Sequence, residues 1–500
     1  MRRKDSMHFL LAAIVLCAAT WTACTGSSDA GRSASASSDS GKIPISTKSE
    51  EARREFLQGR DLAEKLLAQD SLQHFDKAVA LDPDFAYAEL TRANSSPTGT
   101  QFFEHLNKAV ALVDKASEGE RLLILANQAG ANGEVVKQKE LLDKLVAAYP
   151  NDERARFNLG GYYFGQQQYA QAIEQYKKAT ELAPNYSPAY NILGYAYRQA
   201  GDYGNAEQAF KKYIELIPND PNPYDSYAEL LLKMGRFDDS IAQYRKALAV
   251  DEHFVPSHFG IAADLLYMGK PADAAAELQK ITEKARNNGE RRTALFGQTV
   301  VDVDGGKMNQ ALAELDKQYA IGQETNDVAG MAGDLQNKGN ILAEMQKYDA
   351  AQQQFDQLLQ LVEGSNLSQK IKDNAKLFHH FNLAVVAIGK KDYTAAKTHA
   401  EEFSKGAEAS QNAFQIKQSH ALAGTIALAQ KDYDTAITEL QQANEQNPRD
   451  LYRLCQAYQE KGNGAKAQEF CTRAAEFNSL PQLNYAFVRS KAQRVAGKKG

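Results

Sequence analysis

The chain has 500 residues, of which 43% are hydrophobic and 24% are charged, a composition typical of a globular protein that excludes disorder throughout. A formal net charge of -5 provides no basic excess to neutralise phosphates, so we expect no nucleic-acid partner. Four cysteines are too few for a disulfide-rich scaffold or a zinc module with many thiolate ligands.

Residues 1–23 are predicted to be a secretory signal peptide. A basic start over residues 2–4 precedes an apolar run over residues 9–19. This run is too short to favour a helix that spans a bilayer, whereas its length and flanks are typical of a signal peptide. We therefore expect the mature protein to be secreted across a membrane.

The end of this signal resembles that of bacterial lipoproteins. Ala23 and Cys24 stand where that family has them, although Trp21 replaces the usual aliphatic residue. The resemblance implies that Cys24 is lipidated and anchors the protein on the periplasmic side of a membrane, and Thr25 favours the outer membrane. Ordinary cleavage near Ala19 or Ala23 and an uncleaved anchor are the alternatives.

Residues 24–48 are predicted to comprise the lipidated cysteine and a flexible tether. The segment is rich in Ser, Gly and Ala, and this composition favours a flexible linker over a packed element. The tether would hold the folded part of the chain near a membrane, and only the lipid would enter the bilayer.

A repeat of 34 residues follows, and it is clearest between residues 153 and 283. Apolar residues recur at helical spacing within each unit, and a turn such as residues 200–202 divides the unit into two helical runs. Each unit is therefore predicted to be a helix hairpin. The positions related by 34 residues include Pro150, Pro184 and Pro218; Gly160, Gly194, Ala228 and Ala262; Tyr163, Tyr197, Leu231 and Leu265; Ala172, Ala206, Ser240 and Ala274; and Tyr176, Phe210, Tyr244 and Leu278.

This pattern resembles the tetratricopeptide repeat family, and weaker copies extend it over residues 49–480. The resemblance implies an all-α fold, an α-solenoid or superhelix of about twelve antiparallel helix hairpins of the tetratricopeptide type. An interruption near residues 282–291 predicts a boundary between an N-terminal array, residues 49–285, and a C-terminal array, residues 286–480. Residues 481–500 are predicted to form a capping helix and a basic tail.

The resemblance also implies a concave face, lined by the first helix of each hairpin, that binds an extended peptide or a helix of a partner. The mixed aromatic and acidic character of this predicted groove favours an amphipathic or basic partner segment. Packing between neighbouring hairpins is the alternative role for its aromatic residues. The positions predicted to line or flank the groove are Phe157, Phe164, Asn191, Tyr195, Arg198, Asp225, Glu229 and Leu232.

The sequence carries no pattern typical of a catalytic site, a metal centre or a cofactor cradle. Cys455 and Cys471 fall on the two facing helices of one predicted hairpin, where they could form a disulfide in an oxidising periplasm or remain buried thiols. The histidines lack metal-ligand spacing, and we expect them to serve in packing or on the surface. The histidines in question are His379, His380, His399 and His420.

Together these features predict a non-catalytic protein, without cofactor or metal, that acts as a scaffold or adaptor for other proteins or peptides of the bacterial envelope. A chaperone-like periplasmic assembly factor is one alternative, and it would bind many apolar peptides weakly. A regulatory subunit of an envelope enzyme or secretion complex is another, and it would co-purify with one catalytic chain at fixed stoichiometry.

Overall fold

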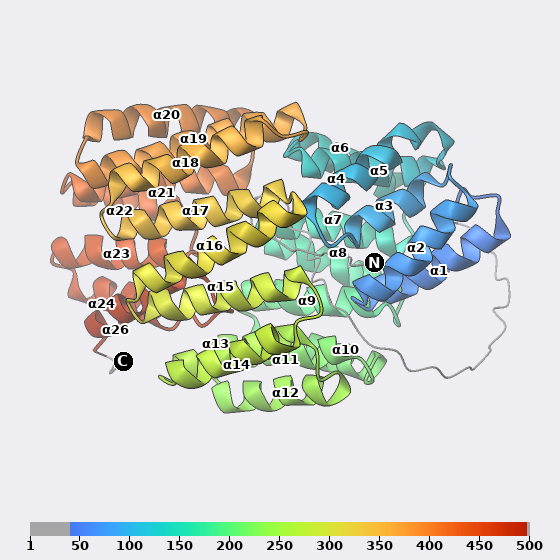
Figure 1. The fold of residues 1–500 in the computed structure, drawn as a ribbon, viewed down its shortest axis with the longest axis horizontal. Helices are drawn as coiled ribbons and strands as arrows, with labels where there is room; N and C mark the ends of the chain where they lie inside the picture. The colour runs from blue at the N-terminus through green and yellow to red at the C-terminus, as the bar shows by residue number, and fades with distance from the viewer. Residues whose placement is uncertain (1–40, 498–500) are drawn as a thin grey trace.

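The computed structural model describes residues 41–497, and within them it contains helices and connecting turns but no strand (Figure 1). The predicted signal peptide, Cys24 and residues 25–40 of the predicted tether lie outside the described residues, as do residues 498–500. The helices in chain order are α1 (Glu50–Glu64), α2 (Ala68–Leu81), α3 (Ala86–Asn94), α4 (Gly99–Ala111), the short 3-10 helix η1 (Val113–Lys115), α5 (Glu118–Ala131), α6 (Val135–Ala148), α7 (Glu153–Gly165), α8 (Tyr169–Leu182), α9 (Ser187–Gln199), α10 (Tyr203–Leu216), α11 (Pro221–Lys233), α12 (Phe237–Val250), α13 (Val255–Tyr267), α14 (Pro271–Lys284), α15 (Asn288–Asp304), α16 (Met308–Thr325), α17 (Val328–Glu344), α18 (Tyr348–Glu363), α19 (Gln369–Lys390), α20 (Tyr393–Ser410), α21 (Ala413–Ala429), α22 (Tyr433–Gln442), α23 (Pro448–Glu460), α24 (Gly464–Ala475), α25 (Leu483–Ala486) and α26 (Arg489–Val495).

Local sequence explains where these helices begin and turn. The side chain of Asp152 caps α7 by accepting hydrogen bonds from the N–H groups of Arg154 and Ala155. Between the two helices of a hairpin, the chain passes through the left-handed region at Gly201, with φ of +79°. Glycine adopts this conformation without the steric cost that a Cβ imposes, so it terminates the first helix and starts the turn.

Several hairpins are held by a small residue on the first helix that faces a large one on the second. A Cβ at Gly194 would lie 2.7 Å from two ring atoms of Phe210, so only glycine permits this approach. Helices α1–α24 pair into twelve consecutive hairpins, and each hairpin packs on the next. The predicted all-α solenoid of helix hairpins is confirmed.

The hairpins change length part-way along the chain. Helices α7–α14 have 13 or 14 residues, whereas α15–α21 have 16 to 22 residues. The longer helices account for the loss of the 34-residue register after residue 287. At the predicted boundary between the two arrays, α14 contacts α15 and the stack of hairpins continues.

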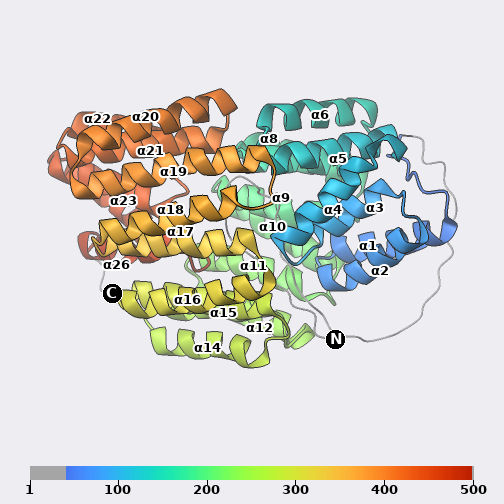
Figure 2. The ribbon, with the colours of Figure 1, turned by 45° about the horizontal axis from the view of Figure 1, so that its top comes forward.

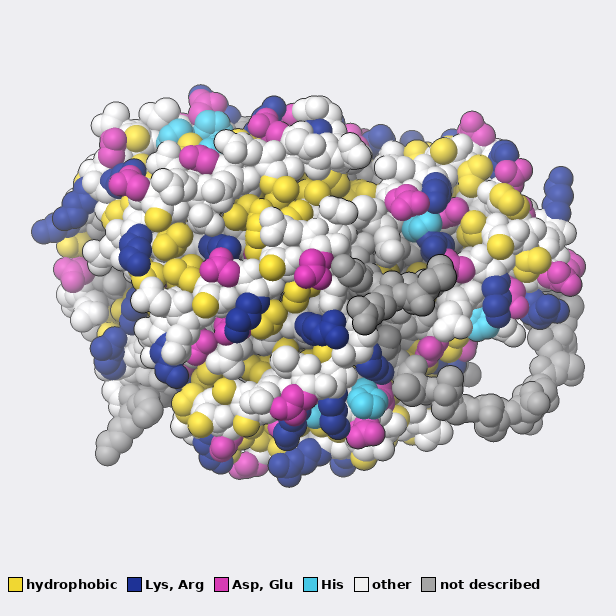
Figure 3. Space-filling view, viewed as in Figure 1, with side chains coloured by type: hydrophobic (Ala, Val, Ile, Leu, Met, Phe, Trp, Pro, Cys, Tyr) yellow, Lys and Arg dark blue, Asp and Glu magenta, His cyan; other side chains and the backbone are white. Residues whose placement is uncertain are grey.

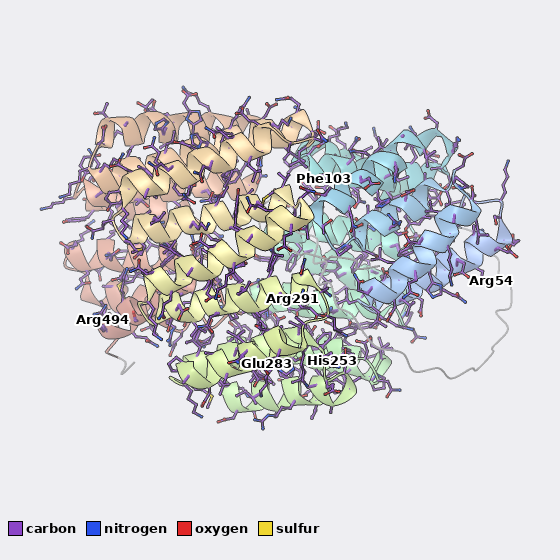
Figure 4. The ribbon with its side chains drawn as sticks, viewed as in Figure 1. Arg54, Phe103, His253, Glu283, Arg291 and Arg494 are labelled. Atoms are coloured by element: carbon purple, nitrogen blue, oxygen red, sulfur yellow. A yellow bond between two sulfur atoms is a disulfide. The ribbon has the colours of Figure 1, made fainter. Side chains whose placement is uncertain are left out.

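The superhelix brings distant hairpins together (Figures 1 and 2). The hydroxyl of Thr100 donates to the Asn326 carbonyl at 3.2 Å, and Lys417 Nζ donates to Oε1 of Gln167 at 2.7 Å. Phe103 of α4 lies at the same junction and packs against an apolar cluster that includes residues of α17 and α18 (Figure 4). A simple solenoid has contacts only between neighbouring repeats, so these contacts close the array on itself.

Residues 41–48, the end of the predicted tether, run in an irregular path along the solenoid before α1 begins. The N–H of Ile43 donates to Asp152 Oδ2 at 2.9 Å, and the N–H of Ser46 donates to Glu120 Oε1 at 3.0 Å. Lys42 also pairs with Glu153. These acceptors stand at the starts of α5 and α7, so this part of the chain is packed against the repeats instead of extending freely.

The C-terminal end also packs back onto the array. In place of one capping helix, the structure has the two short helices α25 and α26. Tyr485 and Phe487 are buried there, and Phe487 shares an apolar cluster with side chains of α15, α16 and α17. Among residues 41–497, no helix combines the length and apolar character needed to span a bilayer.

Cys455 and Cys471 form a disulfide in the last hairpin. Their Cα atoms lie 5.1 Å apart on α23 and α24, and both side chains are fully buried. The bond crosslinks the two helices of the final hairpin, which has a neighbouring hairpin on one side only.

Replacing both cysteines by alanine is expected to lower the free energy of unfolding of this hairpin by about 3 kcal/mol, because the bond closes a loop of 16 residues. Hydrogen exchange of α23 and α24 measures the effect. A reductant should increase exchange in the unaltered protein by a similar amount and leave the double variant unchanged. Equal exchange with and without reductant would contradict the prediction.

Candidate partner-binding groove

The predicted groove residues lie on the first helices α7, α9 and α11. Helix α11 contacts both α9 and α13, so α9, α11 and α13 form one continuous face, which we call the α9–α11–α13 face. Each second helix packs on the other side, which is the arrangement that tetratricopeptide-like hairpins need to form a groove. The side chains on this face fall into a partly exposed cluster and a buried layer.

Tyr195, Arg198 and Glu229 form the partly exposed cluster, which we call the α9–α11 cluster. The Tyr195 hydroxyl donates to Glu229 Oε1 at 3.1 Å, and Arg198 Nη1 donates to Oε2 of the same carboxylate at 2.9 Å. The guanidinium also lies 4.6 Å from the centre of the Tyr195 ring. The Arg198 and Glu229 side chains keep 17% and 14% of their surface exposed, so they can still reach a partner.

Three other predicted groove residues lie in the buried layer. Asp225 is 3% exposed and accepts a hydrogen bond from the Ser257 hydroxyl at 2.7 Å. Burial raises the pKa of Asp225 well above its usual value, and the nearby Glu229 adds to this effect. Asn191 and Leu232 are likewise buried. These three side chains support the face from below instead of presenting a surface to a partner.

The aromatic residues predicted to line or flank the groove pack between helices. Phe157 lies with its ring centre 5.6 Å from those of Tyr176 and Tyr186, and Phe164 packs edge-on against Tyr169. The Tyr195 ring packs in the same way against Phe210 at 5.2 Å. These rings therefore make packing contacts, while the hydroxyl of Tyr195 remains part of the α9–α11 cluster.

Two side chains at the ends of α11 and α13 were not anticipated from the sequence. Lys233 Nζ donates to the carbonyl of Phe477 at 2.6 Å, and the Tyr267 hydroxyl donates to the carbonyl of Ser479 at 2.5 Å. Burial lowers the pKa of Lys233 to about 8, and Arg198 contributes to this shift. These two groups hold the C-terminal segment across the end of the face. Because each donor lies more than 200 residues from its acceptor, no local sequence pattern predicts these hydrogen bonds.

Asp264 is a fully buried carboxyl group on α13. Neither of its oxygens accepts a hydrogen bond from a described residue. Burial raises the pKa of Asp264 from 3.8 to about 8, the nearby Asp238 carboxylate adds to this, and the Ser240 hydroxyl opposes the shift only in part. The group is therefore largely protonated at neutral pH.

Stability should consequently depend on pH through Asp264. Because its pKa is higher in the folded state, the folded state binds more protons between about pH 4 and 8, and stability falls as the pH rises through this window. The free energy of unfolding of Asp264→Asn, relative to that of the unaltered protein, is expected to rise by up to about 1.4 kcal/mol per pH unit between pH 5 and 8. Chemical denaturation measures this. The control is Asp273→Asn, which removes an exposed carboxylate on α14, and a pH-independent effect of Asp264→Asn would contradict the prediction.

A second surface lies between α16, α17 and α18, where an open cleft has a volume of about 330 Å³. Hydrophobic side chains gather over these helices (Figure 3). Two charged side chains also line the cleft. Lys338 Nζ lies 5.0 Å from the centre of the Tyr319 ring and pairs with Asp316 at 2.5 Å. The cleft is lined by Leu312, Asp316, Tyr319, Leu335, Lys338, Leu342, Gln354 and Gln357.

Within residues 41–497, no group of three or more His, Cys, Asp or Glu side chains is arranged to hold a metal ion.

Comparison with known proteins identifies the repeat. Residues 139–187 and 162–221 match one sequence model of the tetratricopeptide repeat, and residues 222–254 match a second. The chain contains tetratricopeptide repeats. The matched segment includes α7, α9 and α11, so the α9–α11 cluster is built on tetratricopeptide hairpins. No significantly similar curated protein was found.

Several solved structures are similar to parts of the chain. A tetratricopeptide repeat protein from Parabacteroides merdae is 16% identical, with 55% of this chain and 94% of that chain covered and a TM-score of 0.36. The MamA protein is 23% identical over 33% of this chain and 91% of that chain, with a TM-score of 0.29. A thermophilic protein with this repeat from Thermus thermophilus is 22% identical over 43% of this chain and 99% of that chain, also with a TM-score of 0.29.

Proposed function

We propose that this protein is a non-catalytic scaffold or adaptor of the bacterial cell envelope that binds a peptide or helical segment of another protein on the α9–α11–α13 face. The α9–α11 cluster is the observation that carries the proposal. It places an aromatic hydroxyl, a guanidinium and a carboxylate from successive first helices at one partly exposed position. Such a combination offers apolar contact and charge-assisted hydrogen bonds to a bound chain.

The charges of this face suit a basic or amphipathic segment. Arg198 is held by Glu229, so a cationic side chain of a partner can share the Glu229 carboxylate. The second carboxyl group, Asp225, is buried, and its raised pKa favours the neutral form, so Glu229 supplies the negative charge of this face. A partner that presents a carboxylate would find one guanidinium already engaged, and its binding would be correspondingly weaker.

The envelope location rests on the N-terminal signal and is supported by the disulfide. Disulfides persist in oxidising compartments such as the periplasm and are rare in the cytosol. We propose that Cys24 is lipidated and that the protein is anchored on the periplasmic side, with the outer membrane favoured by Thr25. Replacing Cys24 by serine should release the protein from the membrane fraction, and retention there would argue against this anchor.

A crosslinked pull-down from native membranes tests the binding role. The double variant Arg198→Gln, Glu229→Gln removes both charges of the α9–α11 cluster and keeps polar groups of similar size. The matched control is Arg236→Gln, Asp239→Asn, which removes an exposed ion pair from α12. A dominant partner that is lost only in the first variant would support the proposal. A dominant partner unaffected by it would place the binding surface elsewhere.

The open cleft at α16–α18 favours one alternative, a chaperone-like assembly factor, because its leucine side chains lie beside polar ones and offer mixed contacts to unassembled clients. In the same pull-down, that role would give many partners that the first variant does not change. A regulatory subunit of an envelope enzyme or secretion complex would instead give one catalytic chain at fixed stoichiometry.

A further inference from the structure

The three helices of the α9–α11–α13 face end in the same way. Each has 13 residues, and their last residues, Gln199, Lys233 and Tyr267, follow one another at intervals of 34 positions. Two positions later each chain turn has a glycine with φ between +73° and +79°. Because the three helix ends share one backbone conformation, these side chains form a row, which we call the donor row. Each of them carries an N–H or O–H group that can donate a hydrogen bond.

Two members of the donor row bind main-chain carbonyls of the C-terminal segment. Lys233 Nζ donates to the carbonyl of Phe477, and the Tyr267 hydroxyl donates to the carbonyl of Ser479. Lys233 Nζ also lies 4.0 Å from the centre of the Phe477 ring, where the ring attracts a cation. The chain's own C-terminal segment thus shows how the donor row holds a polypeptide.

Side chains that bind main-chain carbonyls select a segment that is not helical. In the interior of an α-helix each carbonyl already accepts a hydrogen bond from the N–H four residues further on. Residues 477–482 lie between α24 and α25 and belong to neither helix. Their carbonyls are therefore available to the donor row, and hydrogen bonds of this kind depend on the backbone of the bound segment instead of its side chains.

Gln199, the third member of the donor row, has no such ligand among the described residues. Its side chain is partly exposed, and no hydrogen bond joins its amide to another described residue. The turn after α9 has room for a bound chain, because no described atom beyond the neighbouring residues lies within 4 Å of a Cβ placed on Gly201. At the equivalent turn after α11, Asn478 Nδ2 lies 3.3 Å from a Cβ placed on Gly235. The next residue toward the N-terminus, Arg198, belongs to the α9–α11 cluster.

We propose that a partner protein binds at Gln199 through a non-helical segment, one of whose main-chain carbonyls accepts a hydrogen bond from the Gln199 amide. This inference rests on the proposed function and specifies the partner, since an irregular segment and not a helix is bound. A basic side chain of the same segment can share the Glu229 carboxylate, which Arg198 already contacts. The C-terminal segment keeps Lys233 and Tyr267, so the two chains together fill the donor row.

Photocrosslinking of the full-length protein with a synthetic peptide tests the proposal. The peptide copies residues 476–482, with lysine in the place of Glu476 as the basic side chain and a photoreactive ring in the place of the Phe477 ring. We expect mass spectrometry to locate the crosslink at the end of α9. Gln199→Leu should lower the yield by about threefold to tenfold, the effect of losing one hydrogen bond. Gln199→Lys should preserve the yield, because it restores a donor.

The matched control is Gln208→Leu, which removes an exposed amide from α10 and should leave crosslinking unchanged. Circular dichroism verifies that the variants fold. The inference is overturned if the copied peptide does not crosslink at the end of α9, or if Gln199→Leu crosslinks as well as the unaltered protein. Equal crosslinking there by an alanine-based helical peptide with the same ring would also overturn it. Loss of the native partner in the Arg198→Gln, Glu229→Gln variant would still support the proposed function in each of these cases.

Discussion

Replacing Asp334 by alanine is expected to lower the free energy of unfolding by about 3–5 kcal/mol, because it leaves a buried guanidinium without its counter-charge. Arg292 Nη2 donates to both carboxylate oxygens of Asp334 at 2.8 Å, and each side chain is 3% exposed. The same guanidinium donates to the carbonyl of Gln318. It therefore joins three consecutive helices, α15, α16 and α17, in the middle of the chain.

A double variant distinguishes the loss of the pair from the burial of an unpaired charge. Arg292→Met with Asp334→Leu removes both charges and fills the space with apolar groups, so it should cost much less than Asp334→Ala alone. Chemical denaturation of the single and double variants measures the difference. If Asp334→Ala costs less than about 1 kcal/mol, water has reached the guanidinium and the ion pair is not buried in solution.

Phe487→Ala is expected to cost about 3–5 kcal/mol, since Phe487 is 3% exposed and packs in an apolar core. The effect should also appear far away in the sequence, because that core contains Val300 and Val303 of α15 and Ile341 of α17. Arg489, which pairs with Asp304 at the end of α15, reinforces this contact.

Hydrogen exchange separates this closed arrangement from an open solenoid. In the Phe487→Ala variant, exchange should increase in α15 and α17 as well as in α25. The control is Arg494→Ala on α26, an exposed residue visible in Figure 4, which should leave exchange in α15 unchanged. Faster exchange confined to the C-terminal segment would show that the two parts of the array are independent.

The closure also bears on the proposed binding face. Lys233 and Tyr267 hold the C-terminal segment across one end of α11 and α13 through its backbone carbonyls. A partner bound at the α9–α11 cluster would therefore lie next to this C-terminal segment, which covers one end of the α9–α11–α13 face. Variants that release the C-terminal segment would lengthen the available face.

The repeat pattern predicted the hairpins because it depends on contacts within and between neighbours. The positions of Gly194 and Phe210 carry a small and a large side chain in successive repeats, because one side chain must be small where the facing one is large. This relation is visible in the sequence. The same logic led to Cys455 and Cys471, which stand where other hairpins have a small residue facing an aromatic one. It failed after residue 287, where longer helices change the spacing that the pattern needs.

Groove residues were harder to predict than hairpins. The register placed Tyr195, Arg198 and Glu229 together because equivalent positions on successive first helices are neighbours in space. It could not separate them from Asp225 and Leu232, which the structure buries. Exposure depends on how the first helices tilt and on which distant segments cover them, and neither property follows from spacing alone.

The sequence by itself determined the helix hairpins, their order and the positions at which helices face each other, because these depend on residues within about 34 positions of one another. Only the tertiary structure decided that the array closes on itself, with Thr100 against Asn326 and Phe487 against α15. A small rotation between each pair of hairpins accumulates along the solenoid, so its path is set by the sum of many packing angles. Contacts that arise from such a sum leave no pattern in any single repeat.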